Sequence, residues 1–377
     1  MPNYNDLRPS TDKNRAEYRQ IFPHISDPYR AEIIRTLQKL RMGLDMSHIP
    51  ARRAEDNLII ATWNIQHFGS DLNRTAAGMF CLAEIIARFD LVAIQELKSD
   101  LSDLKKLLRL LGEDWTYIVS DVNYGTKGNY ERMCYIYNAS RVRPSGLVSE
   151  LSPWDEFFEE FPDLVPSDQQ RFLRAPYVMG FETAWKAFSI MSLHLKPNDN
   201  DTGAKLRADE MKLILALLDK KDKERWIDNL IITGDFNFFT DNDKDAETIA
   251  FLNQEGFSEH ADLIGKPTTL SKKNTYDRFF LRSGNYFELS EEEDALSADV
   301  LDPFEFIFKA DGAADHAHAW EEYKLNRGGG AWDQTTRRYN DFRKRQLSDH
   351  LPVWFSLKAD NTDEFLDTKL EENEENL

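Results

Sequence analysis

Short apolar runs rich in β-branched and aromatic residues recur along the chain, and they predict β-strands. The first clear run is NLIIATWNI at 57–65. Seven more runs of this kind lie at 91–95, 115–120, 133–138, 185–195, 229–237, 275–281 and 351–357. Apolar residues at helical spacing predict helices between some of them, at 76–89, 101–111 and 206–218. Strands that mostly follow one another, with helices interspersed irregularly, favour an α/β fold of two packed sheets flanked by helices.

The two ends of the chain differ from this central part. Near the start, Asp27 and Pro28 predict a helix, with Asp27 as the N-cap, and apolar residues at helical spacing follow as far as Leu44. A polar hinge at 50–56 then leads into the first strand, so residues 1–56 are expected to form an N-terminal helical extension. Residues 359–377 form an acidic tail, which predicts either disorder or a loosely held helix.

Three stretches inside the central part look like insertions. Residues 150–170 are acidic and aromatic, and residues 290–302 form an acidic loop. Residues 327–345 contain three consecutive glycines and then a basic run, in which six basic residues stand against two acidic ones. The basic run predicts either a solvated helix or a contact for a nucleic-acid backbone, and the pattern favours the two interpretations equally.

Charge and cysteine content exclude several classes of protein. The chain of 377 residues has 47 Lys and Arg against 66 Asp and Glu, a formal net charge of -19, which argues against general nucleic-acid coating by a basic surface. Acidic clusters can nevertheless hold metal cations that meet phosphates. The two cysteines, Cys81 and Cys134, exclude a disulfide scaffold and a cysteine zinc site. No secretory signal or membrane span is visible, so we expect a cytoplasmic protein without an obligate protein partner.

Polar side chains stand at the ends of five predicted strands. Each has an ordinary explanation as a turn, a cap or a solvated residue. Together they form a set of three carboxylates, two amides and two imidazoles: Asn64, Glu96, His194, Asp235, Asn237, Asp349 and His350. Carboxylate and amide oxygens suit Mg²⁺, Mn²⁺ or Ca²⁺, and the imidazoles can donate or accept protons near neutral pH. The set can therefore support metal-dependent phosphodiester hydrolysis.

The order of the motifs resembles the endonuclease/exonuclease/phosphatase superfamily, and especially its deoxyribonuclease I branch. The resemblance rests on TWNIQHFG, VAIQE, NYERMCYIY, FLRAP, SLHL, TGDFN, TYDRF and LSDHLPV, which span about residues 57–358. It implies that 57–358 is the catalytic domain and that the fold is a four-layer α/β sandwich. In that fold two mostly antiparallel sheets pack face to face with helices outside. It also implies a nuclease that uses Mg²⁺ or Mn²⁺ and whose substrate is nucleic acid, most often DNA.

The resemblance also assigns roles to individual residues. Glu96 and Asn64 resemble the residues that bind the metal, and Asp349 resembles a second carboxylate that binds metal or positions water. Asp235 and Asn237 resemble the pair that orients the attacking water and the scissile phosphate.

Each histidine has an acidic counterpart in the family pattern. His350 resembles a catalytic histidine oriented by Asp277, and His194 resembles a second one oriented by Glu131. Arg174 resembles an arginine that contacts a substrate phosphate. The residues of the basic run that could grip a nucleic-acid backbone are Arg337, Arg338, Arg343, Lys344 and Arg345, and of these Arg337 and Arg338 are predicted to contact substrate phosphate. Trp332 and Tyr339 are possible stacking partners. Which group acts as the base and which as the acid stays open.

Other functions share parts of this pattern. A phosphoesterase of phosphoinositides or sphingomyelin shares the GDFN and SDH motifs, and a non-catalytic scaffold could keep the fold. Two further clusters resemble metal sites. Asp241, Asp243 and Asp245 echo a calcium loop, although a solvated loop with Asp245 as N-cap of a helix from about Ala246 is favoured. His316 and His318 could bind a transition metal, but a surface loop is favoured.

Overall fold

The computed structural model describes most of the chain, and the strands within that part form two mixed sheets. The residues outside the described part are 1, 10, 13–19, 54–55, 70–73, 124–128, 165–171, 184, 199, 223–228, 240, 285–286, 291–295, 328–335 and 375–377. Trp332, the three consecutive glycines at 328–330 and the acidic residues 291–294 lie outside it.

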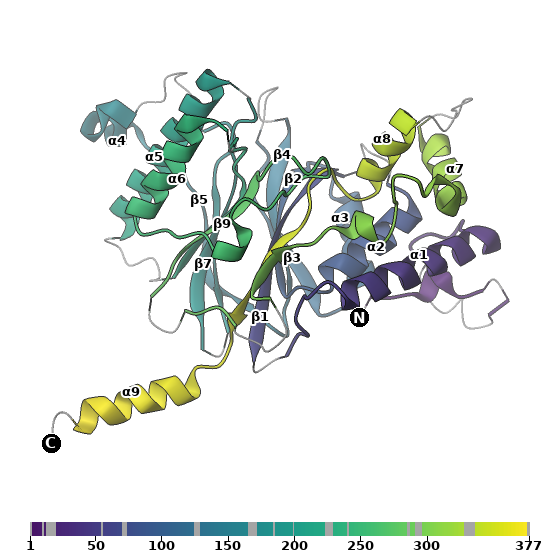
Figure 1. The fold of residues 1–377 in the computed structure, drawn as a ribbon, viewed down its shortest axis with the longest axis horizontal. Helices are drawn as coiled ribbons and strands as arrows, with labels where there is room; N and C mark the ends of the chain where they lie inside the picture. The colour runs from purple at the N-terminus through teal and green to yellow at the C-terminus, as the bar shows by residue number, and fades with distance from the viewer. Residues whose placement is uncertain are drawn as a thin grey trace.

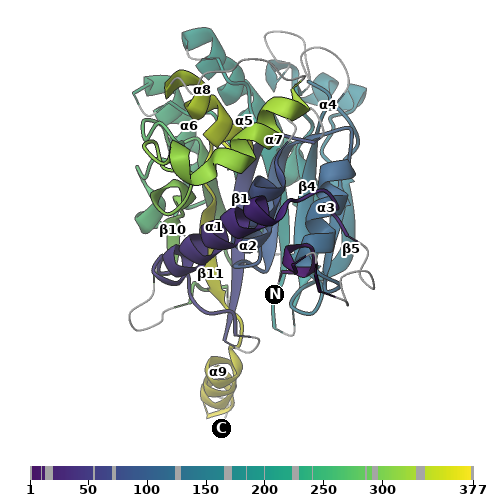
Figure 2. The same cartoon turned by 90° about the vertical axis from the view of Figure 1, so that its right-hand side faces the viewer.

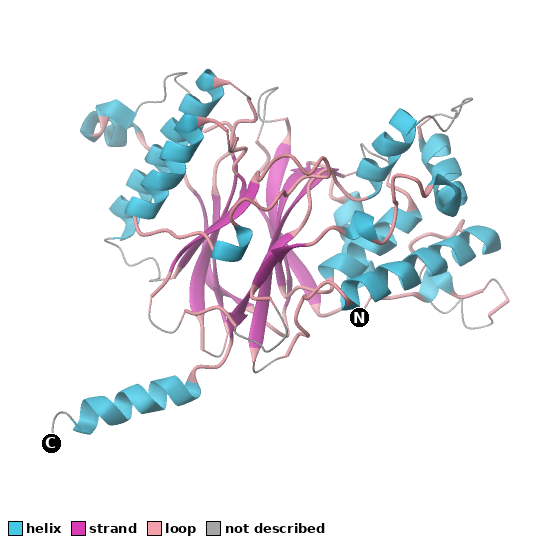
Figure 3. Cartoon of the chain, viewed as in Figure 1, coloured by secondary structure: helices cyan, strands magenta, loops and turns pink. Residues whose placement is uncertain are grey.

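The two sheets pack face to face in the middle of the molecule (Figures 1 and 3). In spatial order, the first sheet contains β10 (Ala298–Val300), β11 (Val353–Lys358), β1 (Asn57–Phe68), β2 (Leu91–Lys98), β4 (Glu131–Asn138) and β3 (Trp115–Val119). The second contains β5 (Arg143–Glu150), β6 (Tyr177–Glu182), β7 (Ala187–His194), β8 (Leu230–Asp235) and β9 (Asp277–Arg282). Neighbouring strands are antiparallel except for two parallel pairs, β1 with β2 and β7 with β8.

Helices cover the outer face of each sheet (Figure 1). The first sheet is covered by α1 (Asp27–Asp45), α2 (Ala76–Ile86), α3 (Ser102–Leu111), α7 (Ala317–Asn326) and α8 (Thr336–Gln346). The second is covered by α4 (Asp155–Glu160), α5 (Asp201–Asp222) and α6 (Asp243–Gln254). Short 3₁₀ helices lie at Asn5–Leu7, Pro162–Leu164, Ala261–Leu263, Pro303–Glu305 and Ala313–His316. The predicted four-layer α/β sandwich is therefore confirmed.

Alternation along β1 explains why the strand is apolar on both faces. Ile59, Ala61 and Trp63 pack into the core between the first sheet and its helices, whereas Leu58 and Ile60 pack into the core between the two sheets. Successive side chains of a strand point to opposite faces, so an unbroken apolar run is the pattern of a strand that is covered twice. A third core fills the space between the second sheet and α5 and α6.

Several elements differ from the sequence-based expectations. The sequence did not predict β5, β6 or β10. β5 is an edge strand with mostly exposed side chains and includes Pro144, and β10 has only three residues. The N-cap of α1 is Ser26, whose hydroxyl accepts the Tyr29 amide, and Asp27 is the first helical residue. The acidic tail, in contrast, agrees with one of its two expected forms: it is a helix, α9 (Thr362–Glu374), which projects from the sandwich with no buried residue (Figure 1).

The helix α1 lies beside the helix α7 (Figure 2), and two carboxylates, the buried Glu32 and the partly buried Glu322, join them. The Glu32 carboxylate accepts the first amides of α7, those of His318 and Ala319, at 2.8 and 3.0 Å. Acceptors at a helix N-terminus satisfy amides that the helix itself leaves free. In addition, Glu322 of α7 accepts the Tyr29 hydroxyl of α1 and the Ala76 amide of α2. The N-terminal residues and the stretch before β11 are thus joined in one outer layer.

The acidic segment at 241–252 is a structural feature of α6. The N-cap is Asn242 rather than the expected Asp245, and it accepts the amides of Lys244 and Asp245. Asp245 is buried and forms a two-armed ion pair with Arg207 of α5, at 2.9 and 2.6 Å. Its carboxylate also accepts the Phe239 amide, so it ties the loop after β8 to both helices.

Replacing Asp245 with alanine is expected to destabilise the protein by roughly 3–5 kcal/mol, because Arg207 would keep a buried charge without its partner. Urea denaturation followed by circular dichroism measures the change. The matched control is Asp243→Ala, two residues away on the exposed side of α6, for which we expect a change within about 1 kcal/mol. Equal stability of the two variants would contradict the assigned role of the ion pair.

Candidate active site

The inter-sheet side of β1 changes from apolar to polar as the strand runs toward one edge of the sandwich. Leu58 and Ile60 lie in the inter-sheet core, and Thr62 and Asn64 continue the same face. Gln95 of β2 donates to the Thr62 hydroxyl at 3.2 Å and to the Ser192 hydroxyl of β7 at 2.9 Å. This buried bridge connects the two sheets, and it marks the floor of a polar layer that begins with Asn64.

Asp235, at the end of β8, lies at the centre of that polar layer. Its Oδ2 atom accepts a hydrogen bond from Asn64 Nδ2 at 2.9 Å, and Oδ1 accepts the Asn237 amide at 3.0 Å. Two imidazole Nε2 atoms face the same Oδ2 atom, that of His194 at 3.6 Å and that of His350 at 3.8 Å. Residues from β1, β7, β8 and the segment before β11 therefore converge on one carboxylate.

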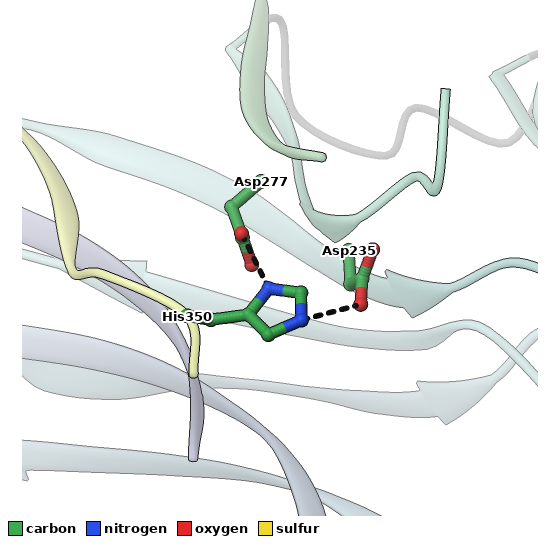
Figure 4. Close-up of side chains that lie close together, drawn as sticks. All are labelled: Asp235, Asp277 and His350. Carbon is green, nitrogen blue, oxygen red and sulfur yellow. Dashed lines mark hydrogen bonds and ion pairs between the residues drawn. The ribbon is translucent and has the colours of Figure 1, made fainter. Parts of the chain in front are cut away.

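His350 is held between two carboxylates (Figure 4). Its Nδ1 atom lies 2.7 Å from Asp277 Oδ2 at the start of β9, and its Nε2 atom faces Asp235. Burial alone would lower the pKa of His350, but the charges of Asp277 and Asp235 outweigh it and raise the pKa well above its usual value. Burial raises the pKa of Asp235 to about 7, against the opposing charge of His350. We conclude that His350 is charged at neutral pH and that Asp235 is close to its titration point.

His194 has a different environment. Its Nδ1 atom lies 3.5 Å from Glu131 Oε2 and has no hydrogen-bond partner, because Arg174 Nε donates to that oxygen at 2.7 Å. Lys98 Nζ approaches the other oxygen of Glu131 at 3.4 Å. Burial and the charge of Arg174 lower the pKa of His194 well below its usual value. The two histidines are therefore in opposite protonation states at neutral pH, His194 neutral and His350 charged.

Glu96 and Asn64 form an oxygen-rich corner beside Asp235. Asn64 Nδ2 donates to Glu96 Oε1 at 3.0 Å, and the His67 amide donates to Glu96 Oε2 at 2.9 Å. Burial and the protonated form of His194 would shift the pKa of Glu96 in opposite directions, upward and downward; with His194 neutral, the hydrogen bonds from the His67 amide and Asn64 are what favour the ionised carboxylate. Asn64 Oδ1 is buried and accepts no hydrogen bond from the residues that the structure describes. An orphaned amide oxygen next to an ionised carboxylate fits a hard divalent cation.

Backbone strain is concentrated around these side chains. His67, Glu96 and Asn237 are not glycines, yet their φ angles are 46°, 61° and 51°. Such left-handed conformations cost free energy and persist where the surrounding structure holds them. Gly234 has a φ of 126°, and a Cβ atom there would lie 2.1 Å from the Leu193 carbonyl oxygen. Only glycine therefore allows β8 to approach β7 closely enough to place Asp235 opposite His194.

Asp349 and the two arginines of the basic run, Arg337 and Arg338, are not among the side chains that face the Asp235 carboxylate. Asp349 is partly exposed, and it accepts a hydrogen bond from Gln66 Nε2 at 2.9 Å, with Lys344 Nζ at 3.9 Å. Arg337 lines a groove next to Asp349 and His350, whereas Arg338 is exposed and is not part of the groove lining. Within the described residues, the tightest group of possible metal-ligating side chains is Asp235, Asp277 and His350, in which His350 contacts the two carboxylates directly.

The second candidate metal cluster, at His316 and His318, is a structural contact. His316 is buried and accepts the Phe308 amide on Nε2, and His318 pairs with Glu32. Neither imidazole belongs to a metal-binding group in the described part of the chain. The expectation of a flexible surface loop is also wrong for His316, because its buried imidazole packs against the Phe308 ring with the two ring centroids 4.3 Å apart.

Comparison with known proteins places these strand-end residues in a family. The model of the Endonuclease/Exonuclease/phosphatase family matches residues 61–287. The chain belongs to this family. The matched region contains the strand-end residues from Asn64 to Asp277 and ends before α7, α8, Asp349 and His350.

Similar proteins include two named deoxyribonucleases. Deoxyribonuclease-1 of Homo sapiens is 28% identical over 190 residues, which cover 48% of this chain and 61% of that protein. Deoxyribonuclease gamma of Rattus norvegicus is 27% identical over 287 residues, which cover 67% of this chain and 84% of that protein. Among solved structures, the endonuclease/exonuclease/phosphatase from Beutenbergia cavernae DSM 12333 aligns with a TM-score of 0.50 and 13% identity. That alignment covers 80% of this chain and 72% of the other, and it supports the fold.

Sequence reasoning missed several polar residues of this family member's site. Gln66 and Lys98 lie within the motifs WNIQHFG and VAIQELK, but neither was assigned a contact. Spacing gave no signal for Lys98, because the strand alternation of β2 is interrupted between Ile94 and Leu97, where Glu96 has a φ of 61°. Lys344 was visible only as one member of the basic run.

Among the described helices, none is long and apolar enough to cross a membrane.

Asp277→Asn is expected to lower the pKa of His350, because the substitution removes the carboxylate that stabilises the charged imidazole. In the wild type, the His350 imidazole should stay protonated until the pH is well above neutral. In Asp277→Asn, it should lose its proton at a lower pH than in the wild type. Titration of the histidine ring signals by NMR measures this difference. Asp262→Asn, at an exposed carboxylate that contacts His260, is the control and should leave the His350 titration unchanged. An unchanged titration in Asp277→Asn would contradict the proposed pairing.

Proposed function

We propose that this protein hydrolyses phosphodiester bonds in DNA by in-line attack of water, with Mg²⁺ or Mn²⁺ as its cofactor. The observation that carries the proposal is the convergence of two imidazoles in opposite protonation states on the buried Asp235 carboxylate. A phosphodiester needs both a group that accepts a proton from water and a group that supplies positive charge and a proton to the leaving oxygen.

Each side chain has a role that follows from its protonation state. Asp235, with a pKa of about 7, orients the attacking water and accepts its proton. His350, kept charged by Asp277, stabilises the negative charge that develops on the phosphate and donates a proton to the leaving oxygen. His194 is neutral and therefore carries one N–H; in the tautomer protonated on Nε2, it donates a hydrogen bond to a phosphate oxygen. Asn237 fixes Asp235 through its amide and donates its side-chain amide to the Leu195 carbonyl.

The metal ion belongs at the oxygen-rich corner. Asn64 Oδ1 and the Glu96 carboxylate would hold it, and Asp349 would contribute a second carboxylate directly or through water. A bound divalent cation there supplies charge stabilisation to the phosphate. The hydrogen bonds that Glu96 accepts from Asn64 and the His67 amide support this assignment, because they favour the ionised carboxylate that a hard cation requires.

Arginine side chains are proposed to contact the substrate phosphates. Arg174 is nine-tenths buried beside His194, and its Nη1 atom has no hydrogen-bond partner, so it can donate to a phosphate oxygen. Arg337 and Arg338 are exposed on α8 and are proposed as outer contacts. Arg343, in contrast, is excluded, since it is buried, donates to the Phe308 carbonyl and lies over the Phe304 ring. Its part of the expected basic grip is therefore wrong.

The remaining parts of the proposal rest on coarser observations. The deoxyribonucleases that resemble this chain favour DNA as the substrate. Cys81 and Cys134 are both buried and unpaired, which supports the proposed cytoplasmic location, where thiols stay reduced. We also propose that residues 57–358 act as the catalytic domain, with 1–56 as an extension and 359–377 as a tail.

His350→Ala and Asp235→Asn are each expected to reduce DNA cleavage on the order of 10²-fold or more while the protein stays folded. Plasmid and linear DNA, single-stranded DNA, RNA, a phosphoinositide and sphingomyelin are incubated with the wild-type protein and Mg²⁺, Mn²⁺ or EDTA. His260→Ala, at a partly exposed histidine outside the site, is the matched control. Absence of cleavage with either metal, or full activity of His350→Ala, would contradict the proposal. Hydrolysis of the phosphoinositide or sphingomyelin without cleavage of any nucleic acid would show that the substrate is a phospholipid and not DNA.

Glu96→Gln and Asn64→Ala are each expected to weaken Mn²⁺ binding by about tenfold or more, because each removes an oxygen ligand or its charge. Isothermal titration calorimetry in the absence of DNA measures the affinity independently of turnover. Glu247→Gln, at an exposed glutamate on α6, is the control and should bind Mn²⁺ as the wild type does. Unchanged Mn²⁺ affinity in both Glu96→Gln and Asn64→Ala would show that these two residues do not bind the metal.

A further inference from the structure

A groove of about 1140 Å³ opens directly beside the catalytic histidine. Asp349 and His350 form its inner end, and its walls come from the loop before β9, the segment before α7 and the helix α8. We call it the α8 groove and define it by Lys272, Asn274, Tyr276, Lys309, Arg337 and Lys344, which all line it. The groove extends beyond the polar layer around Asp235 and is not needed to hold a single phosphodiester.

The helix α8 presents one polar face to this groove. Arg337, Asn340, Asp341 and Lys344 line it, and their spacing of three, four and seven residues places them on one side of a helix. Buried residues on the other side, such as Phe342, pack into the core between the first sheet and its helices. Because the apolar face fixes the orientation of the helix, the polar face remains directed at the groove.

Most charges in the groove are already compensated. Lys272 pairs with Asp302 at 2.5 Å, and Lys344 lies 3.9 Å from Asp349. Glu305 and Asp341 add exposed negative charge, so the groove as a whole is not strongly basic.

Lys309 and Arg337 differ from these lysines. Both are exposed, and neither side chain forms a hydrogen bond or an ion pair within the part of the chain that the structure describes. Two cations without a partner, standing in a groove that ends at the catalytic histidine, are available for an anionic ligand.

We infer that the α8 groove binds the polynucleotide strand where it continues past the scissile phosphate. Lys309 and Arg337 contact the backbone phosphates of that strand, and the amides of Asn274 and Asn340 supply hydrogen bonds to sugars or bases. The mixed charge of the groove fits a ligand that carries both phosphates and polar bases better than it fits a purely anionic ligand. The inference rests on the proposed function, and it makes the protein selective for polymers over small phosphodiesters.

The test compares substrates of different length. Single-stranded DNA of 2, 4, 8 and 16 nucleotides and the small diester bis(4-nitrophenyl) phosphate are hydrolysed by the wild type and by Lys309→Gln/Arg337→Gln. The charge-matched control is Lys105→Gln/Lys212→Gln, which removes two exposed cations from α3 and α5, outside the groove. We expect kcat/KM of the wild type to rise with length and then level off.

In the groove variant, KM for the 16-mer should rise about tenfold, and the slope of log kcat/KM against log salt should flatten by roughly 1.4, since two phosphate contacts are lost. KM for the small diester, which is too short to reach these outer contacts, should rise far less than KM for the 16-mer, and the control should match the wild type on every substrate. Equal losses on the 16-mer and the small diester, or no loss on either, would overturn the inference while leaving the nuclease intact. A wild-type protein that cleaves plasmid DNA but none of these oligonucleotides would overturn the inference, and one that cleaves neither would overturn the proposed function as well.

Discussion

The buried carboxylate of Asp235 is the constraint on which the site depends. Placing a carboxylate between two sheets is unfavourable unless polar groups surround it, and here they come from four separate segments of the chain. The two sheets must therefore meet in one register for the charge to be tolerated. The Gln95 bridge between Thr62 and Ser192 fixes that register just below the site. Stability of the sandwich and arrangement of the polar residues thus depend on the same contacts.

The contrast between the two histidines arises from their second neighbours. The main side-chain partner of the Asp277 carboxylate is His350, and the charge of Asp277 holds His350 in the charged form. Glu131 is shared among Lys98, Asn129 and Arg174, so little of its charge acts on His194. Similar acid–imidazole pairs can thus give opposite protonation states, and the cations around the acid decide which state occurs.

The sequence predicts the main architecture well because most central strands are covered on both sides. The runs at 57–65 and 229–237 are apolar throughout, and polar residues at their ends stand out against them. The edge strands β5 and β10 were missed because an exposed or three-residue strand has little hydrophobic pattern. The roles of Asp245 and Arg343 were equally hidden, since charged residues on a predicted helix look solvated until a buried partner is known. The residue that a charged side chain contacts in the folded protein is often distant in sequence, so the local spacing of residues does not reveal it.

The carboxylate of Glu32 connects two regions that both lie outside the match to the family model. That match covers residues 61–287, whereas α1 precedes it and α7 and α8 follow it. Through the amides of His318 and Ala319, α1 supports α7, and Phe342 of α8 packs against Trp320 of α7. The outer layer over the first sheet therefore combines α2 and α3, from the matched region, with three helices from its two flanks. Since α8 also lines the groove beside His350, the orientation of that groove wall depends on contacts that begin in the N-terminal helix α1.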